Sequence, residues 1–159
     1  MADIDAARLT AMFGTIAEEI ERQKERLCEL DGVIGDADHG IAMSLGFGAV
    51  RDALAKLDLS AADPTLVLNT AAKSFLNAVG ASSGPLYATA FMRAGAAVKG
   101  KPTLGDLDAV AMLQAMAKGI QDRGKAEIGE KTMVDAWAPA AEAAGNALAA
   151  GKNLAQCLD

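Results

Sequence analysis

Three carboxylates and a histidine are concentrated in one short stretch of the sequence, residues 30–40 (LDGVIGDADHG). The stretch contains Asp31, Asp36 and Asp38, and His39 is the only histidine of the chain. Carboxylates this close together repel one another, so folding them into one place costs free energy unless a cation offsets their charge. Oxygen ligands of this kind suit Mg2+, which usually completes its shell with water and phosphate oxygens. The spacing therefore predicts a divalent-metal site that serves an anionic ligand.

Other interpretations of these side chains stay open. Asp is common in turns and at helix N-caps, and Asp38 is well placed to cap the first turn of a helix that starts after it. A calcium loop is a weaker alternative, because the stretch lacks the D-x-D-x-D-G pattern with a distal Glu. His39 is either an ordinary residue of the cap region or a donor to a phosphate, since Mg2+ prefers oxygen ligands.

Two further stretches are rich in glycine and in small polar residues. Residues 80–85 (GASSGP) could present backbone N–H groups and two hydroxyls to a phosphate at a helix start. Residues 124–132 contain Lys125 and Lys131, which are either solvated or help to balance the charge of a phosphate. Neither stretch is a Walker A loop, because each lacks the Gly-Lys-Ser/Thr ending. Taken alone, a small-residue turn before a proline is more often a simple connection between helices.

The elements that must position these loops are predicted to be helices. Apolar residues recur at helical spacing and no segment alternates with a period of two, which favours an all-α fold without a sheet. Asp63-Pro64 and Pro85 fit helix starts, and Thr132 with Asp135 resembles a capping arrangement. In the second helix, the residues expected to face the interior are Ile41, Leu45, Val50, Leu54 and Leu57. The predicted helices cover about residues 5–29, 39–57, 64–79, 85–99, 107–124 and 133–149, with the start of a seventh at 153–159.

We expect these helices to form an antiparallel up-and-down bundle in a single domain that covers residues 1–159. In such an array, alternate connections lie at the same end. The loops 31–38, 80–84 and 124–131 follow the first, third and fifth predicted helices. They are therefore expected to meet at one end of the bundle and to form one site.

Composition narrows the class of protein. The chain has 159 residues, enough for one domain with a core, and with 52% hydrophobic but only 4% aromatic residues the core must consist mainly of small aliphatic side chains. The net charge of −6 argues against a nucleic-acid backbone or an anionic membrane as the main partner. The sequence contains neither an apolar run of membrane-spanning length nor a secretory signal, so a cytoplasmic protein is expected. Cys28 and Cys157 are expected to be reduced structural thiols.

Three motifs in this order resemble the nucleotide-binding L subunit of dihydroxyacetone kinases. They are LDxxIGDADHG at residues 30–40, GASSGPLY at 80–87 and RGKAxxGEKTMxD at 123–135. The match covers nearly the whole chain. The resemblance implies an α-helical barrel of eight antiparallel helices with a nucleotide at one end.

The resemblance also implies which residues bind. Two Mg2+ ions would bridge the aspartates to the phosphates of ADP or ATP, and no protein nucleophile is required, because phosphoryl transfer depends on positioning and charge neutralisation. The residues so implied are Asp31, Asp36 and Asp38 for the metal ions, His39, Gly40, Ala81, Ser82 and Ser83 for the phosphates, and Gly124 and Met133 near the adenine.

Partner subunits follow from the same resemblance. A K-type subunit would hold dihydroxyacetone covalently, and this chain would deliver the phosphoryl group to that small ketose. In phosphotransferase-dependent systems, an M-type phosphohistidine donor rephosphorylates the bound ADP, whereas ATP-dependent relatives exchange the nucleotide. For this chain we expect the phosphotransferase-dependent system, a relay in which the M-type subunit rephosphorylates bound ADP. The alternatives are a non-catalytic nucleotide-binding regulatory module of the same fold and a plain helical bundle whose acidic loop binds Ca2+ adventitiously.

Two features depart from the family pattern. Ala42 stands where family members commonly carry Asn. The sequence ends at Asp159, where about two further helices and a tail over the nucleotide would follow in the family. Six helices and the start of a seventh cannot close a barrel of eight. We therefore expect a truncated product or fragment whose exposed apolar seam drives homo-oligomerisation or leaves the nucleotide site open.

Overall fold

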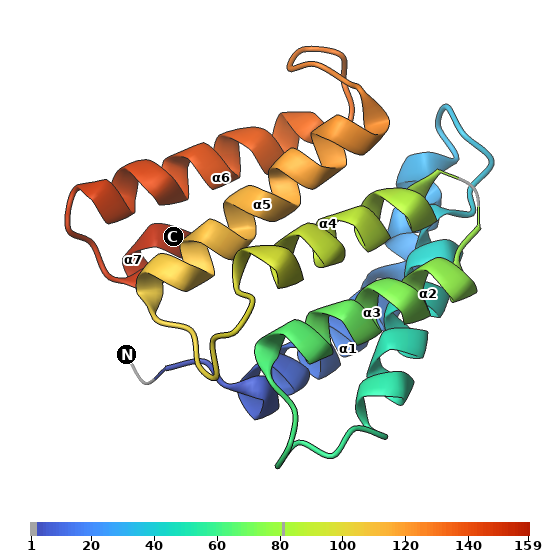
Figure 1. Cartoon of the computed structure of the whole chain (residues 1–159). Coiled ribbons are helices and arrows are strands. Elements are labelled where there is room, and N and C mark those ends of the chain that lie inside the picture. Colours follow the sequence, from blue (N-terminus) through green and yellow to red (C-terminus); the bar gives the residue numbers. More distant parts are fainter. Residues whose placement is uncertain (1–2, 81) are drawn as a thin grey trace.

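The computed structural model describes residues 3–80 and 82–159, and these residues form an array of helices (Figure 1). An isolated antiparallel bridge, in which Ile4 and Leu104 exchange backbone hydrogen bonds of 2.9 and 2.8 Å, is the only β-type pairing within those two ranges. The prediction of an all-α fold is confirmed. The helices are α1 (Ala6–Asp31), α2 (His39–Leu54), α3 (Pro64–Ala78), α4 (Ser83–Ala97), α5 (Asp106–Gly124), α6 (Val134–Ala149) and α7 (Leu154–Leu158).

Local capping explains where several helices begin. The Asp63 carboxylate accepts a hydrogen bond of 2.7 Å from the Leu66 N–H, and Pro64 occupies the first turn of α3, as predicted. Asn153 caps α7 in the same way, with a bond of 3.1 Å from the Gln156 N–H. These starts depend on residues three apart, so they can be recognised in the sequence.

Several predicted helix boundaries differ from the structure by two or three residues, and two of them have a clear local cause. Helix α2 ends at Leu54 rather than near Leu57, because the Leu57 N–H bonds back only three residues, to the Leu54 carbonyl, and tightens the last turn. Helix α4 begins at Ser83, so Pro85 is not its first residue. Proline is tolerated there because the N–H groups of the first helical turn have no partner within the helix.

Consecutive helices pack side by side as an up-and-down array (Figure 1). Helix α1 packs on α2 and α3, and at the other side of the array α6 packs on α5 and α7. The connections α1–α2, α3–α4 and α5–α6 lie at the same end of the molecule, as predicted. In the part of the chain that the structure describes, no helix is long and apolar enough to cross a membrane.

The main core lies between α1, α2, α3 and α4 and is centred on phenylalanines. The rings of Phe13 and Phe91 meet edge to face with centroids 5.3 Å apart, and Phe47 meets Phe75 at 5.2 Å. Smaller apolar clusters join α5 to α6 and α7. The four phenylalanines are therefore concentrated where four helices converge, and aliphatic residues and methionine fill the rest of this core.

The buried face of α2 differs from the prediction. Ile41 and Leu45 were expected in the interior, but their side chains are 47% and 58% exposed. The buried face instead contains Met43 and Phe47, together with Val50 and Leu54 as predicted. Helix α2 has apolar residues on two faces, and two of its glycines, Gly40 and Gly46, are buried on the face that approaches its neighbours most closely. A Cβ at Gly46 would lie 2.4 Å from the Phe75 ring, so that face packs inward.

Candidate metal and ligand site

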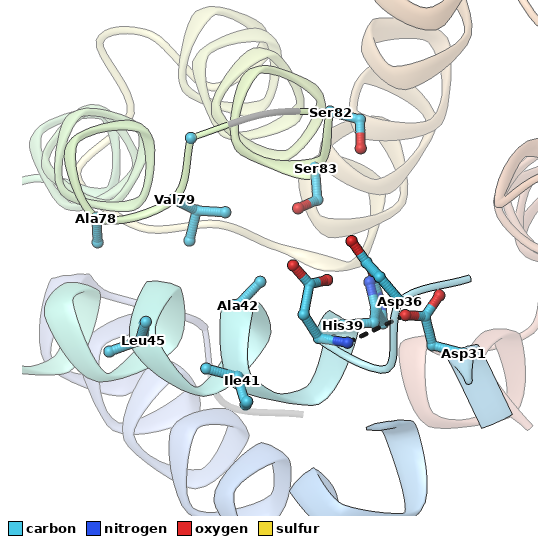
Figure 2. Close-up of a pocket in the computed structure, with 12 residues that line it drawn as sticks. Asp31, Asp36, His39, Ile41, Ala42, Leu45, Ala78, Val79, Ser82 and Ser83 are labelled. Atoms are coloured by element: carbon cyan, nitrogen blue, oxygen red, sulfur yellow. Dashed lines mark hydrogen bonds between the residues drawn. The ribbon is translucent and has the colours of Figure 1, made fainter. Parts of the chain in front are cut away.

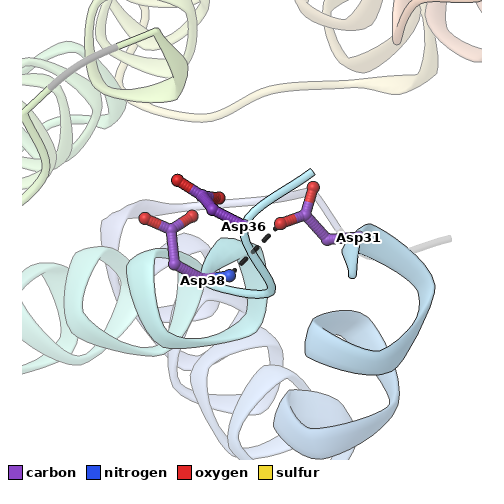
Figure 3. Close-up of side chains that lie close together, drawn as sticks. All are labelled: Asp31, Asp36 and Asp38. Atoms are coloured by element: carbon purple, nitrogen blue, oxygen red, sulfur yellow. Dashed lines mark hydrogen bonds between the residues drawn. The ribbon is translucent and has the colours of Figure 1, made fainter. Parts of the chain in front are cut away.

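The three aspartates of the first connection converge (Figure 3). Asp31 is the last residue of α1, Asp38 immediately precedes α2, and Asp36 lies in the loop between them. One carboxylate oxygen from each lies within 4.8 Å of the others. Asp31 is half-buried, whereas Asp36 and Asp38 are exposed. The sequence-based prediction that these carboxylates are brought together agrees with this geometry.

Backbone hydrogen bonds hold the loop in this shape. The Asp31 carbonyl accepts from the Gly35 N–H at 2.6 Å, and the Asp31 carboxylate accepts from the Asp38 N–H at 3.2 Å. Ala37, between Asp36 and Asp38, takes a left-handed conformation with φ of 61°. The Asp38 carboxylate makes no capping hydrogen bond to α2. Its interpretation as a simple helix cap is therefore wrong, and its side chain faces the other carboxylates.

The electrostatics of this acidic cluster (Asp31, Asp36 and Asp38) favour a cation. The negative charge of Asp36 raises the pKa of Asp38, with slight desolvation, a hydrogen bond with Asp36 and the charge of Asp31 adding to the effect and His39 opposing it. The ion pairs found in the described part of the chain do not include these carboxylates. An oxygen-only donor set without a protein cation fits Mg2+.

A cavity of 440 Å³ opens beside the acidic cluster, and we call it the first cavity. In Figure 2, Ser82 and Ser83 lie across this cavity from Asp36 and His39. Its lining combines a polar end with an apolar end that α2 and α3 contribute. The lining residues are Asp31, Asp36, Asp38, His39, Ile41, Ala42, Leu45, Ala78, Val79, Gly80, Ser82 and Ser83.

Two buried glycines let the backbone segments around this cavity approach closely. A Cβ on Gly40 would lie 2.0 Å from the Lys24 carbonyl oxygen, and a Cβ on Gly84 would lie 1.9 Å from that of Val79. Gly40 thus seats the first turn of α2 against the end of α1, which brings Asp38 towards Asp31. It is buried beneath the cavity and does not line it.

A second cavity of 790 Å³ adjoins the first and is mostly apolar. It lies between the end of α1 and the starts of α4 and α6. The indole of Trp137 meets the ring of Tyr87 edge to face, with centroids 6.5 Å apart. Burial raises the pKa of Tyr87, and a hydrogen bond with Trp137 partly opposes this shift. The lining residues are Leu27, Leu30, Asp31, Ile34, His39, Ser82, Ser83, Leu86, Tyr87, Thr132, Met133, Ala136 and Trp137.

The remaining predicted site residues are distributed unevenly. Met133 lines the second cavity. Gly124 lies instead in a smaller cavity of 310 Å³ that it shares with Ser82 and Arg123. Ala81 lies outside the described residues.

Several lining residues were not predicted as site residues. Tyr87 and Trp137 come from α4 and α6, and Ile41 and Leu45 were assigned to the core. One compositional signal was present, because Tyr87 is the only tyrosine and Trp137 the only tryptophan of a chain with 4% aromatic residues. No sequence spacing places them on the same cavity.

Comparison with known proteins identifies the family. The family model described as the DAK2 domain matches residues 33–159. The chain is 39% identical over 137 residues to the ADP-binding subunit DhaL of PEP-dependent dihydroxyacetone kinase 2 of Listeria innocua, and 39% identical over 120 residues to that of the Escherichia coli kinase. These matches cover 84% and 76% of this chain, and the chain spans 63% and 56% of the length of those two relatives.

A solved structure has the same fold. The dihydroxyacetone kinase from C. freundii, crystallised in complex with AMP-PNP and Mg2+, matches with a TM-score of 0.77 at 23% sequence identity. The match covers 95% of this chain and 27% of that one. The similarity establishes the helical fold, and the family model covers well over half of the sequence. The chain therefore belongs to the DAK2 domain family.

Proposed function

We propose that this chain binds ADP or ATP through Mg2+ and acts as the nucleotide-binding L-type subunit of a dihydroxyacetone-type kinase. The observation that carries the proposal is the acidic cluster, whose carboxylates face one another beside a cavity with Ser82 and Ser83 on its other side. The names of the two DhaL relatives, both ADP-binding subunits, support it.

Asp31, Asp36 and Asp38 are the proposed metal ligands, and the resemblance to L subunits leads us to expect two Mg2+ ions. When bound, Mg2+ would neutralise phosphate charge and make the terminal phosphorus more electrophilic. The raised pKa of Asp38 fits this role, because a cation replaces the repulsion between neighbouring carboxylates with attraction.

The two cavities suggest an orientation for the nucleotide. They share Asp31, His39, Ser82 and Ser83, so we place the phosphates where the cavities meet. Ser83 begins α4, whose first backbone N–H groups and helix dipole favour an anion. The base then lies in the second cavity against Tyr87, Trp137 and Met133, where its flat apolar faces meet aromatic and thioether side chains. The terminal phosphate points into the first cavity.

The residues of this chain would position the phosphoryl group rather than react with it. His39 would donate a hydrogen bond to a phosphate oxygen, and the hydroxyls of Ser82 and Ser83 would do the same from the other side. A hydroxyl of the ketose, held on a K-type subunit, would attack the terminal phosphorus while the bond from that phosphorus to its bridging oxygen breaks. An M-type phosphohistidine donor would then rephosphorylate the ADP, and direct use of ATP is the alternative.

Nucleotide binding is the first test. We expect the gently purified protein to retain ADP or to bind it in calorimetry with Mg2+, and EDTA to abolish the binding. A protein that binds no ADP at any Mg2+ concentration would overturn the proposal. Binding of Ca2+ without any nucleotide would point to an adventitious site in a helical bundle.

Reconstitution tests the reaction. The chain is mixed with a K-type subunit and dihydroxyacetone, and the phosphorylated ketose is measured with ATP and, separately, with a phosphohistidine donor. Product with the phosphohistidine donor alone supports the relay. A chain that binds ADP but transfers no phosphoryl group with either donor would be a regulatory module of the same fold.

A further inference from the structure

The Asp135 carboxylate, in the first turn of α6, bonds backwards to the loop that precedes the helix. One carboxylate oxygen accepts a hydrogen bond of 2.6 Å from the Gly129 N–H, and the other accepts one of 2.9 Å from the Thr132 N–H. The bond to Thr132 joins residues three apart and stabilises the start of α6, whose N-cap residue is Met133. The bond to Gly129 spans six residues and adds nothing to the helix itself. It ties the loop to α6.

The loop is wound so that its N–H groups converge on this carboxylate. Gly129 has φ of 97° and Lys131 has φ of 58°, both in the left-handed region. Alternation of this kind turns successive N–H groups towards one anion. Lys131 has a side chain, so its conformation is strained and must be held by surrounding contacts. A hydrogen bond of 2.9 Å from the Glu127 N–H to the Glu130 carboxylate stabilises the same loop.

The residues held by this loop line the second cavity. Thr132 and Met133 lie on its wall together with Tyr87 and Trp137, whereas Asp135 does not line it. The Thr132 hydroxyl also accepts a bond of 3.2 Å from the Val134 N–H, which continues the loop rigidly into α6. The carboxylate of Asp135 is therefore connected by hydrogen bonds to the loop residues that form part of the cavity wall.

We infer that Asp135 is a positioning residue for the second cavity, because its carboxylate holds loop 129–133 so that Thr132 and Met133 form a fixed wall. The identity of the ligand, the base end of a nucleotide, rests on the proposed function. The anchoring of the loop does not. Hydrogen bonds to the carboxylate also lower its pKa, most through the Gly129 N–H, so the group is charged in this role.

The test compares Asp135→Ala and Asp135→Asn with a matched control, Asp58→Ala. Asp58 accepts bonds from the N–H and the hydroxyl of Ser60, but it lies in the α2–α3 connection, at the other end of the array. Calorimetry measures the affinity for ADP with Mg2+ and, separately, for Mg2+ alone. Hydrogen exchange measures the amides of Gly129 and Thr132, and the emission of Trp137, the only tryptophan, reports on the cavity wall.

We expect Asp135→Ala to weaken ADP binding about tenfold, equivalent to about 1.4 kcal/mol, and to leave Mg2+ affinity unchanged. The Gly129 and Thr132 amides should lose protection. Asp135→Asn keeps one acceptor oxygen, so its loss of ADP affinity and of amide protection should lie between those of the wild type and Asp135→Ala. This variant keeps the test decisive if Asp135→Ala does not fold. Asp58→Ala should match the wild type in all these measurements.

The outcomes separate this inference from the proposed function. Unchanged ADP affinity in both Asp135 variants, or an equal loss of Mg2+ affinity, would overturn the positioning role. A wild-type chain that binds no ADP would overturn the proposed function. In that case, unchanged amide protection and unchanged Trp137 emission in Asp135→Ala would overturn the anchoring as well, whereas loss of protection would support it.

Discussion

Two connections at the same end of the array use aspartate in opposite ways. In the α1–α2 connection, the carboxylates of Asp31, Asp36 and Asp38 face one another, and the charge of Asp36 raises the pKa of Asp38. At the α5–α6 connection, the Asp135 carboxylate in the first turn of α6 faces backbone N–H groups of the loop, and these lower its pKa. The second loop supplies the partners of its own anion. The first loop gives the Asp31 carboxylate one hydrogen bond, from the Asp38 N–H, and leaves three carboxylates facing one another, so we propose that a cation from outside offsets their charge.

The largest expected effect comes from removing a carboxylate of the first loop. Asp36→Ala should weaken Mg2+-dependent ADP binding by at least about a hundredfold, because fewer oxygen ligands then hold the cation. Calorimetry with ADP and Mg2+ measures the loss. Asp52→Ala removes an exposed carboxylate of α2 outside the acidic cluster and should bind as the wild type does. Unchanged ADP binding in Asp36→Ala would refute the metal assignment.

The next largest effect is a loss of stability when the close packing of α1 against α2, on either side of the first loop, is disturbed. Gly40→Ala should lower the free energy of unfolding by about 1–3 kcal/mol, because the new methyl group meets the Lys24 carbonyl. Denaturant unfolding measures this change. A Cβ at Gly48, in the same helix, meets no atom within 4 Å, so Gly48→Ala should instead stabilise by about 0.5–1 kcal/mol. Equal effects of the two substitutions would contradict the close approach of α1 and α2.

A smaller effect is expected for Asp38→Asn, whose change in melting temperature should have opposite signs without and with Mg2+. The folded-state pKa of Asp38 is raised, so its contribution to stability is fully present below the unfolded pKa and is lost as the pH rises through the folded pKa. At neutral pH without metal, Asp38→Asn should therefore raise the melting temperature slightly. With excess Mg2+ it should lower the melting temperature instead, since a ligand is lost. Thermal melts in EDTA and in Mg2+ measure both, and a shift of the same sign in both would argue against a cation site.

The smallest effect is a difference between the pH values at which the carboxylates of Asp135 and Asp38 titrate. The folded-state pKa of Asp135 is lowered, so its contribution is present above the unfolded pKa, near 3.8, and is lost as the pH falls through the lower folded value. In NMR spectra of the metal-free protein, the Gly129 and Thr132 amides should keep their shifts down to this pH and move only below it. Asp38 should titrate above 3.8. If the two carboxylates titrate together, the contrast between the loops fails.

Features that depend on near neighbours in the chain could be predicted from the sequence. The all-α fold, the cap at Asp63 with Pro64, and the meeting of three connections at one end all follow from helical periodicity, short-range capping and alternation of chain direction. The acidic cluster was also predicted, because Asp31, Asp36 and Asp38 lie within eight residues of one another. The roles of the predicted binding residues stay proposals.

Features that depend on how helices approach one another were decided only by the tertiary structure. Periodicity alone did not show which apolar face of α2 is buried, because Ile41 and Leu45 are as apolar as Met43 and Phe47. Close contact at Gly40 and Gly46 selects the face. Likewise, Tyr87 and Trp137 are fifty residues apart and share a cavity only because α4 and α6 both begin beside it. Burial and convergence depend on long-range packing, and a local pattern does not encode the partner against which a side chain packs.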